Sequence, residues 1–148
     1  MYVRWNGVFS EVFLAHNGVR QGGVMSPYLF NMYINEISLE LNKQPIGYNF
    51  QRCRINHLLY ADDLVLFSPS SKGLQQLIDC CSCVGNDLNI IFNDSKTVCM
   101  TICNASNKKC KTPFPDMYMN EKKLINVDVY KYLGHYISSD LSDDKDIK

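Results

Sequence analysis

Apolar residues recur at helical spacing in two stretches of the chain, and each stretch predicts an amphipathic helix. The first helix begins at Pro27, a residue favoured in the first helical turn, with Ser26 as a fitting N-cap. The second can be capped by Ser70 or Ser71, and its pattern fades near Leu88. The apolar positions of the two helices are Leu29, Phe30, Tyr33, Ile34, Ile37 and Leu41, then Leu74, Leu77, Ile78, Cys81 and Val84.

The first residues of the chain predict a β-hairpin. Residues 2–5 and the apolar-rich run 11–15 flank Asn6-Gly7, a dipeptide suited to a tight turn. A further turn, Asn17-Gly18, ends this hairpin. The Gly-rich residues 19–26 then form a loop that leads into the first helix.

A second hairpin is predicted after a helix break at residues 43–47. Residues 55–67 form two short apolar strands interrupted by Ala61-Asp62-Asp63, so this hairpin carries acids at its tip. Beyond the second helix the chain alternates between loops and short strands. The expected segments are a loop at 89–96, strands at 97–103, 117–119, 122–124 and 129–137, a polar connection at 104–115, and the start of a helix in 138–148.

Composition and charge limit the class of protein. The 148 residues are 46% hydrophobic, enough for one globular core, and 15 basic residues balance 15 acidic ones. A net charge of zero argues against a chain that grips a nucleic-acid backbone by itself, because such proteins usually carry a basic surface. No stretch approaches the roughly 20 apolar residues of a membrane span, and the start lacks a secretory signal. We expect no membrane partner.

The seven cysteines are an odd number, which favours a reducing, intracellular compartment, nucleus or cytoplasm, over secretion. Two clusters can be compared with zinc sites. The cysteines of residues 80–83 are too closely spaced for the usual Cys-x2-Cys arm, and those of residues 99–110 have no histidine at ligand spacing. Ordinary thiols are the simpler interpretation.

The adjacent carboxylates of Asp62 and Asp63 require an explanation, because like charges side by side repel unless a cation lies between them. Mg²⁺ prefers carboxylate oxygens and keeps positions open for water and phosphate, so the pair suits phosphoryl transfer. The alternative is a solvated Asp-Asp turn with no chemical role. On the residue pattern alone, the turn is the simpler of the two.

Neighbouring motifs favour the chemical interpretation. Tyr60-Ala61-Asp62-Asp63 resembles the YxDD signature of reverse transcriptases, and the upstream segment from Arg20 to Phe30 resembles that family's QGxxxSP loop and following helix. The two motifs stand in the family's order. Residues 88–100 are similar to the family's next motif, and Tyr130-Lys131-Tyr132-Leu133-Gly134 to a later element on the primer-grip side. The YADD form with a downstream YLG most resembles the non-LTR retrotransposon enzymes.

The resemblance implies a catalytic site built around Asp62 and Asp63, which would bind two Mg²⁺ or Mn²⁺ ions in the complete enzyme. The implied partners are an RNA template, a DNA primer and deoxynucleoside triphosphates. Lys96 would act on the leaving pyrophosphate, although an exposed lysine after a loop is commonly only solvated. Tyr60 is expected to pack against the hairpin rather than to take part in the reaction.

The same resemblance assigns the Gly-rich loop to the incoming nucleotide and the template. Gln21 with Gly22 and Gly23 could present its side chain and backbone amides to these ligands, since glycine permits close approach. Ser26 belongs to the same binding set. Arg20 could contact phosphate or simply cover the surface. The alternative for the whole loop is a plain connection before a helix.

The chain departs from the family pattern upstream. The family places another catalytic aspartate on a strand before the QGxxxSP loop, whereas the only acid before residue 20 here is Glu11, in surroundings that do not match. We also expect the fingers and most of the thumb to be missing from these 148 residues. We therefore expect an α+β fold, a partial polymerase palm with an antiparallel sheet and helices packed on one face.

The expected organisation is a partial palm in residues 1–104, a linker or long connection in 105–116, and the end of the palm with the start of the thumb connection in 117–148. By itself this chain is expected to be inactive. One alternative is a truncated or domesticated remnant that binds nucleic acid or a protein partner without catalysis. Another is a viral RNA-dependent RNA polymerase, which typically has Gly-Asp-Asp where this chain has Ala61-Asp62-Asp63.

Overall fold

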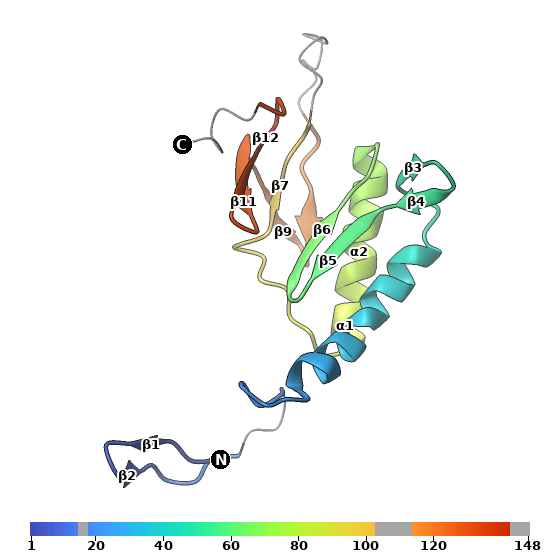
Figure 1. Ribbon diagram of the computed structural model, residues 1–148. Coiled ribbons are helices and arrows are strands. Elements are labelled where there is room, and N and C mark those ends of the chain that lie inside the picture. Colours follow the sequence, from blue (N-terminus) through green and yellow to red (C-terminus); the bar gives the residue numbers. More distant parts are fainter. Residues whose placement is uncertain (15–17, 103–113, 143–148) are drawn as a thin grey trace. The chain divides into compact units, whose positions relative to one another are not determined.

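The computed structural model describes residues 1–14, 18–102 and 114–142. These fall into two compact units, Met1–Asn35 and Glu36–Lys148, and each is described by itself. The described residues form two helices and six two-stranded β-ladders (Figure 1). This is an α+β composition, as expected, but with small separate ladders in place of one sheet.

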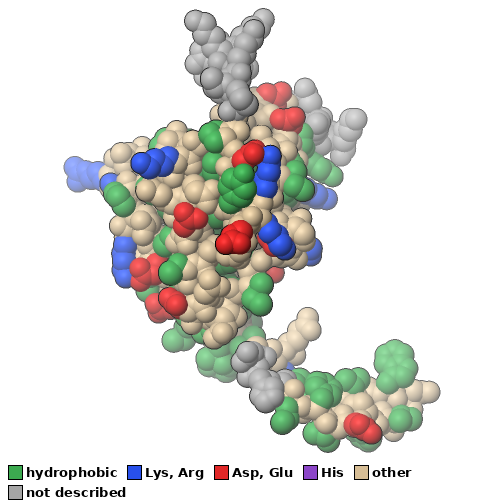
Figure 2. Space-filling view, turned by 180° about the vertical axis from the view of Figure 1, so that it is seen from behind, with side chains coloured by type: hydrophobic (Ala, Val, Ile, Leu, Met, Phe, Trp, Pro, Cys, Tyr) green, Lys and Arg blue, Asp and Glu red, His purple; other side chains and the backbone are tan. Residues whose placement is uncertain are grey.

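The first unit opens with the predicted hairpin at Asn6-Gly7, whose φ angles are 47° and 82°. Its strands are β1 (Arg4–Trp5) and β2 (Val8–Phe9), which pair antiparallel. The prediction that residues 11–15 form the second strand is wrong, because a two-residue turn pairs Trp5 directly with Val8. Figure 2 shows several hydrophobic side chains along this hairpin. The predicted Asn17-Gly18 turn lies partly outside the described residues.

Helix α1 (Ser26–Lys43) follows. Of its predicted apolar stripe, Ile34, Ile37 and Leu41 are buried, whereas Leu29 and Tyr33 near its start are exposed. The helix ends where the break was expected. Ser26 is not an N-cap in front of the helix but its first residue, a correction to the prediction. Its hydroxyl donates to the Arg20 carbonyl, which belongs to the preceding loop. The division between the two compact units falls inside α1.

Helix α2 (Ser71–Asp87) has the predicted apolar face, with Leu77, Ile78 and Cys81 buried. Of the two candidate caps, Ser70 is the N-cap, and its hydroxyl accepts a 3.1 Å hydrogen bond from the Gly73 amide. Burial raises the pKa of the Cys81 thiol to about 12. Within the described part of the chain the cysteines are free thiols, namely Cys53, Cys80, Cys81, Cys83 and Cys99.

Two hairpins stand between the helices. Strands β5 (His57–Tyr60) and β6 (Asp63–Leu66) form the predicted acid-tipped hairpin. Strands β3 (Tyr48–Phe50) and β4 (Cys53–Ile55) form another hairpin that the pattern did not predict. Its turn uses Gln51 at φ 54°, and glutamine is not a residue that signals a turn.

The remaining strands are short. They are β7 (Val98–Cys99), β8 (Tyr118–Met119), β9 (Lys122–Lys123), β10 (Ile125–Asn126), β11 (Val129–Tyr132) and β12 (His135–Ser138). The strand predicted over residues 97–103 is thus reduced to β7 in the described range, and the one over 129–137 is a hairpin turning at Leu133-Gly134. The antiparallel expectation also needs correction, because β7 and β10 pair parallel.

A core of Ile78 from α2 and residues from the later strands holds this unit together. Its other buried members are Cys99, Met117, Met119 and Leu124, with Leu66, Leu74, Phe92 and Phe114 packed around them. Strand β6 and ladder β8–β9 thus share one core with α2 (Figure 1). The predicted linker and the predicted C-terminal helix start lie mostly outside the described residues. Within the described ranges, neither helix is long and apolar enough to cross a membrane.

Candidate metal-binding hairpin and nucleotide loop

The Asp62-Asp63 pair lies at the tip of the β5–β6 hairpin. Tyr60 pairs with Asp63, so the turn consists of Ala61 and Asp62 alone, and both carboxylates are exposed. Ala61 adopts φ 51°, a left-handed conformation that non-glycine residues rarely take. Register thus gives the two acids different places, Asp62 in the turn and Asp63 at the start of β6.

Contacts at the end of the β5–β6 ladder opposite the turn hold the hairpin in place. The Phe67 amide donates to the Asn56 carbonyl at 2.7 Å, which extends the β5–β6 ladder by one further bond. Leu66 packs against the core described above. Tyr60, on β5, is exposed, so its predicted packing role is not seen in the structure. The turn is therefore presented to solvent by a ladder anchored at its other end.

The loop of residues 20–26 is a compact turn in the first unit. The Gly23 amide donates to the Arg20 carbonyl at 3.0 Å, and the Ser26 amide donates to the Gly23 carbonyl at 3.1 Å. A Cβ at residue 23 would lie 2.6 Å from the Ser26 hydroxyl oxygen, so a larger residue would displace the hydroxyl that bonds the Arg20 carbonyl. Gly22 has φ 79°, another conformation suited to glycine. Arg20, Gln21 and Gly22 are exposed, whereas Gly23 and Ser26 are half-buried.

Lys96 lies in the loop before β7, with its side chain exposed. Its amide donates to the Asn93 carbonyl at 3.1 Å and to the Asn93 side-chain oxygen at 3.2 Å. The neighbouring Asp94 carboxylate pairs with Lys122 at 2.5 Å, an interaction that lowers the pKa of Asp94. Lys96 is thus held by its backbone on a turn and presents its ammonium group to solvent.

The donor set at the hairpin is small. In residues 1–14, 18–102 and 114–142, no group of three or more histidine, cysteine, aspartate or glutamate side chains could hold a metal ion. Asp62 and Asp63 nevertheless fit Mg²⁺ chemically, since both are exposed oxygen donors with room for water and phosphate oxygens. Two carboxylates are fewer than the six ligands that an octahedral ion takes.

Comparison with known proteins decides the family. A model described as "Reverse transcriptase (RNA-dependent DNA polymerase)" matches residues 1–137. The chain belongs to the reverse transcriptase family. The family predicted from the YADD and QGxxxSP motifs is therefore confirmed.

Curated relatives of this reverse transcriptase chain are retrotransposon proteins. The Pol polyprotein of the type-2 retrotransposable element R2DM of Drosophila melanogaster is 30% identical over 133 residues, which are 87% of this chain and 12% of the relative. That of the type-1 element R2 of Popillia japonica is 28% identical over 127 residues, 83% of this chain and 21% of the relative. The chain thus spans about an eighth to a fifth of these polyproteins, and the predicted non-LTR type is confirmed.

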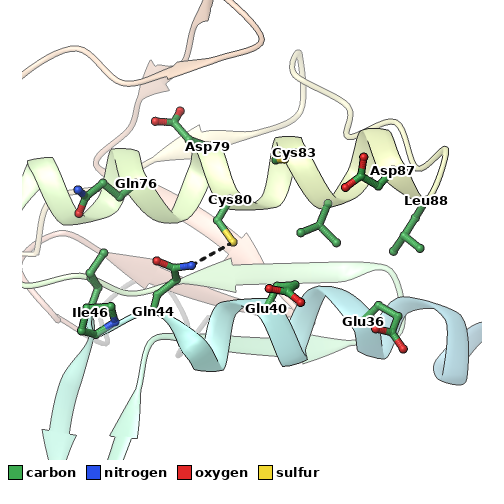
Figure 3. Close-up of a pocket in the computed structure, with 12 residues that line it drawn as sticks. Glu36, Glu40, Gln44, Ile46, Gln76, Asp79, Cys80, Cys83, Asp87 and Leu88 are labelled. Atoms are coloured by element: carbon green, nitrogen blue, oxygen red, sulfur yellow. Dashed lines mark hydrogen bonds between the residues drawn. The ribbon is translucent and has the colours of Figure 1, made fainter.

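A groove of this reverse transcriptase chain lies between α2 and the last turns of α1, and no residue of the YADD hairpin lines it (Figure 3). Its volume is about 950 Å³, and its charged lining is acidic, from Glu36, Glu40, Asp79 and Asp87. The Gln44 amide approaches the Cys80 sulfur at 3.8 Å across it. Burial, with Glu40 nearby, raises the pKa of that thiol. Carboxylates repel phosphate, so this groove does not suit nucleic acid.

Sequence reasoning missed two groups beside the reverse transcriptase hairpin. Tyr132 on β11 has a raised pKa, caused first by burial and then by the Asp63 carboxylate, which places the YLG-containing hairpin near the acids. Asn56 and His57, at the base of β5, are hydrogen-bonded to each other and to α1. The burial of a single asparagine next to an apolar run has no periodic signature, so the pattern could not reveal it.

Proposed function

We propose that this chain carries the metal-binding turn and the nucleotide loop of an RNA-directed DNA polymerase encoded by a retroelement. The observation that carries the proposal is the exposed Asp62-Asp63 turn at the end of an anchored hairpin, in a chain that matches the reverse transcriptase family over residues 1–137. The relatives, Pol polyproteins of retrotransposable elements, support the same assignment. The proposed substrates are an RNA template, a DNA primer and deoxynucleoside triphosphates.

Asp62 and Asp63 would each offer a carboxylate to two Mg²⁺ ions, or to Mn²⁺ in their place. When bound, such ions activate the primer 3′ hydroxyl and stabilise charge on the departing pyrophosphate. The role of the hairpin is to hold the carboxylates at a fixed separation, because register makes Asp63 a ladder residue and Asp62 a turn residue. Lys96, exposed and held by its backbone on a turn, would neutralise or protonate the pyrophosphate.

The nucleotide and template would be bound by Arg20, Gln21, Gly22, Gly23 and Ser26. In the loop, the exposed Gln21 side chain is available to hydrogen-bond a base or sugar, and Arg20 to pair with phosphate. Gly23 and Ser26 act differently, since their mutual packing fixes the turn that presents the others. These substrates are intracellular, which supports the nucleus or cytoplasm as the place of action.

This chain alone would not polymerise. Two-metal catalysis uses ions about 3.5–4 Å apart, held by carboxylates that usually come from more than one strand. In the described part of the chain, Asp62 and Asp63 are not joined by another ligand group. A further carboxylate would come from another part of the polymerase.

Primer extension on poly(rA) with oligo(dT) and Mg²⁺ or Mn²⁺ tests the proposal. The 148-residue chain is compared with a longer polypeptide from the same gene that contains it. We expect extension by the long form and none by the short one, and Asp62→Asn or Asp63→Asn in the long form should reduce the rate by several orders of magnitude. Glu121→Gln is the matched control, because Glu121 is also an exposed acid in a hairpin turn, between β8 and β9.

The second candidate is a remnant that binds nucleic acid or a protein partner without catalysis. The two-carboxylate donor set favours it as a property of this chain taken alone. An inactive long polypeptide that still binds a primer-template duplex would support the remnant. If the long polypeptide stays active with Asp62→Asn and Asp63→Asn together, neither candidate holds. The hairpin would not bind the catalytic metals, and the chain would not be an inactive remnant.

A further inference from the structure

A hydrogen-bonded chain of three side chains links α1 to the base of the YADD hairpin. The Asn56 amide nitrogen donates to the Leu41 carbonyl at 2.6 Å, and the Asn56 side-chain oxygen lies 2.7 Å from Nδ1 of His57. Nε2 of His57 lies 2.7 Å from the Ser38 hydroxyl oxygen. Ser38 and Leu41 are neighbours on one face of α1, so the base of β5 is attached to the helix at two points.

These contacts define the tautomer of neutral His57. Because the Asn56 nitrogen is used by the Leu41 carbonyl, the Asn56 oxygen faces the ring and can only accept a hydrogen bond. Nδ1 must therefore carry a proton. In the neutral ring Nε2 is then the acceptor, and Ser38 donates to it. The arrangement satisfies every polar group of the neutral imidazole.

The junction is tightly packed. Asn56 is 3% exposed, and its backbone carbonyl accepts from the Phe67 amide, the first bond of the ladder that leads to Asp62 and Asp63. A Cβ at residue 47 would lie 2.6 Å from the Ile55 carbonyl oxygen and 2.9 Å from Cβ of Asn56. The backbone after α1 thus passes so close to the residues before β5 that only glycine fits at position 47.

We propose that Asn56, His57 and Ser38 are positioning residues: they fix the hairpin that carries Asp62 and Asp63 on α1, and they do so most firmly while His57 is neutral. Protonation would give Nε2 a hydrogen, so the Ser38 hydroxyl would have to change from donor to acceptor. It would also place a positive charge in a half-buried site. The consequence for catalysis rests on the proposed polymerase function. The consequence for the hairpin does not.

The surroundings of His57 offer no compensation for a positive charge. The charged residues on the neighbouring elements are Glu36, Glu40 and Lys43 on α1, Arg54 on β4 and Asp63 on β6. Of these, Glu40 and Lys43 pair with each other, and Asp63 lies at the far end of the ladder from His57. Burial, and not a charged neighbour, lowers the pKa of His57.

Imidazole NMR of the 148-residue chain tests the contacts directly. We expect the proton of neutral His57 on Nδ1, and titration below the ordinary value near 6.5. Asn56→Asp should raise the pKa of His57, because a carboxylate would then face Nδ1. His57 protonated on Nε2, or a titration that Asn56→Asp leaves unchanged, would overturn the proposal.

Amide hydrogen exchange tests the positioning. Protection of the β5–β6 amides, measured against the β11–β12 hairpin, should fall as the pH drops through the pKa of His57, and His57→Gln should abolish that pH dependence. His135 lies on the reference hairpin, so His135→Gln is the matched control. This substitution should leave the pH dependence of β5–β6 protection unchanged. If His57→Gln does not fold, Ser38→Ala should speed exchange of the β5–β6 amides about fivefold, and Ser38→Thr should restore it. Equal protection across this pH range refutes the proposal.

A final measurement tests whether the positioning by Asn56, His57 and Ser38 affects catalysis. In a polypeptide active in primer extension, Ser38→Ala should lower kcat about fivefold or more with an unchanged KM for the nucleotide, and Ser38→Thr should recover it. An unchanged kcat in Ser38→Ala would show that the Ser38–His57 contact does not position the hairpin for catalysis. If no polypeptide from the gene is active, the proposed function fails. The NMR and exchange results still decide whether Asn56, His57 and Ser38 position the hairpin.

Discussion

The Asp63 carboxylate on β6 acts on the Tyr132 phenol on β11, 69 positions later in the sequence. Partial burial is the larger cause of the raised pKa of Tyr132, and the negative charge of Asp63 is the second. The YLG-containing hairpin therefore lies near the acidic turn. The resemblance predicted this hairpin on the primer-grip side, and that role stays a prediction.

Removing the Asp63 charge should lower the pKa of Tyr132. A carboxylate disfavours the phenolate, so Asp63→Asn makes ionisation of Tyr132 easier, while Asp62→Asn, whose charge does not contribute to the shift, is the control and should have a smaller effect. The measurement is a ¹³C NMR titration of selectively labelled tyrosine, assigned with Tyr132→Phe. Identical titrations in wild type and Asp63→Asn would place the two groups apart.

Metal binding at the hairpin should be weak. Magnesium gives up water reluctantly, and the chain offers two adjacent carboxylates with no further ligand group in its described part. We expect a Kd of about 1 mM or weaker, read from Mn²⁺ broadening of the amide signals around Ala61, and lost in Asp62→Asn. Glu121→Gln should keep the effect. Tight binding that survives Asp62→Asn would locate the metal elsewhere.

Ala61→Gly should stabilise the hairpin. Ala61 has φ 51°, and glycine adopts this conformation without the steric cost that a Cβ imposes, so we expect a gain of about 0.5 kcal/mol. Gly134→Ala is the converse test in the β11–β12 turn. Gly134 has φ 95° and open space around it, so only backbone strain counts, and we expect a loss of about 1 kcal/mol. Urea unfolding followed by circular dichroism measures both, and a loss of stability in Ala61→Gly contradicts the first.

The cap of α2 can be tested by two neighbouring serines. The Ser70 hydroxyl accepts from the Gly73 amide, whereas Ser71 is already the first helical residue. Ser70→Ala should therefore cost about 1 kcal/mol, and Ser71→Ala should stay within about 0.5 kcal/mol of wild type. Equal losses in the same urea experiment would mean that Ser70 is not the cap.

Much of the fold was predictable because its signals are local. The apolar spacing of α1 and α2 and the two turns at Asn6-Gly7 and Ala61-Asp62 each depend on residues a few positions apart. The acids were thereby placed correctly at a hairpin tip. Ser26 was misjudged, since its hydroxyl could cap a helix or reach back to Arg20, and only the loop's conformation chooses between them.

The sequence by itself determined the family, the two helices and the acidic turn, because motif order and local periodicity are written in consecutive residues. Tertiary structure alone decided the parallel pairing of β7 with β10, the nearness of Tyr132 to Asp63, and the attachment of His57 to Ser38. Each joins segments 19 or more positions apart. Such contacts form when separate elements pack on a shared core, and no short stretch of sequence specifies which distant partner it will meet.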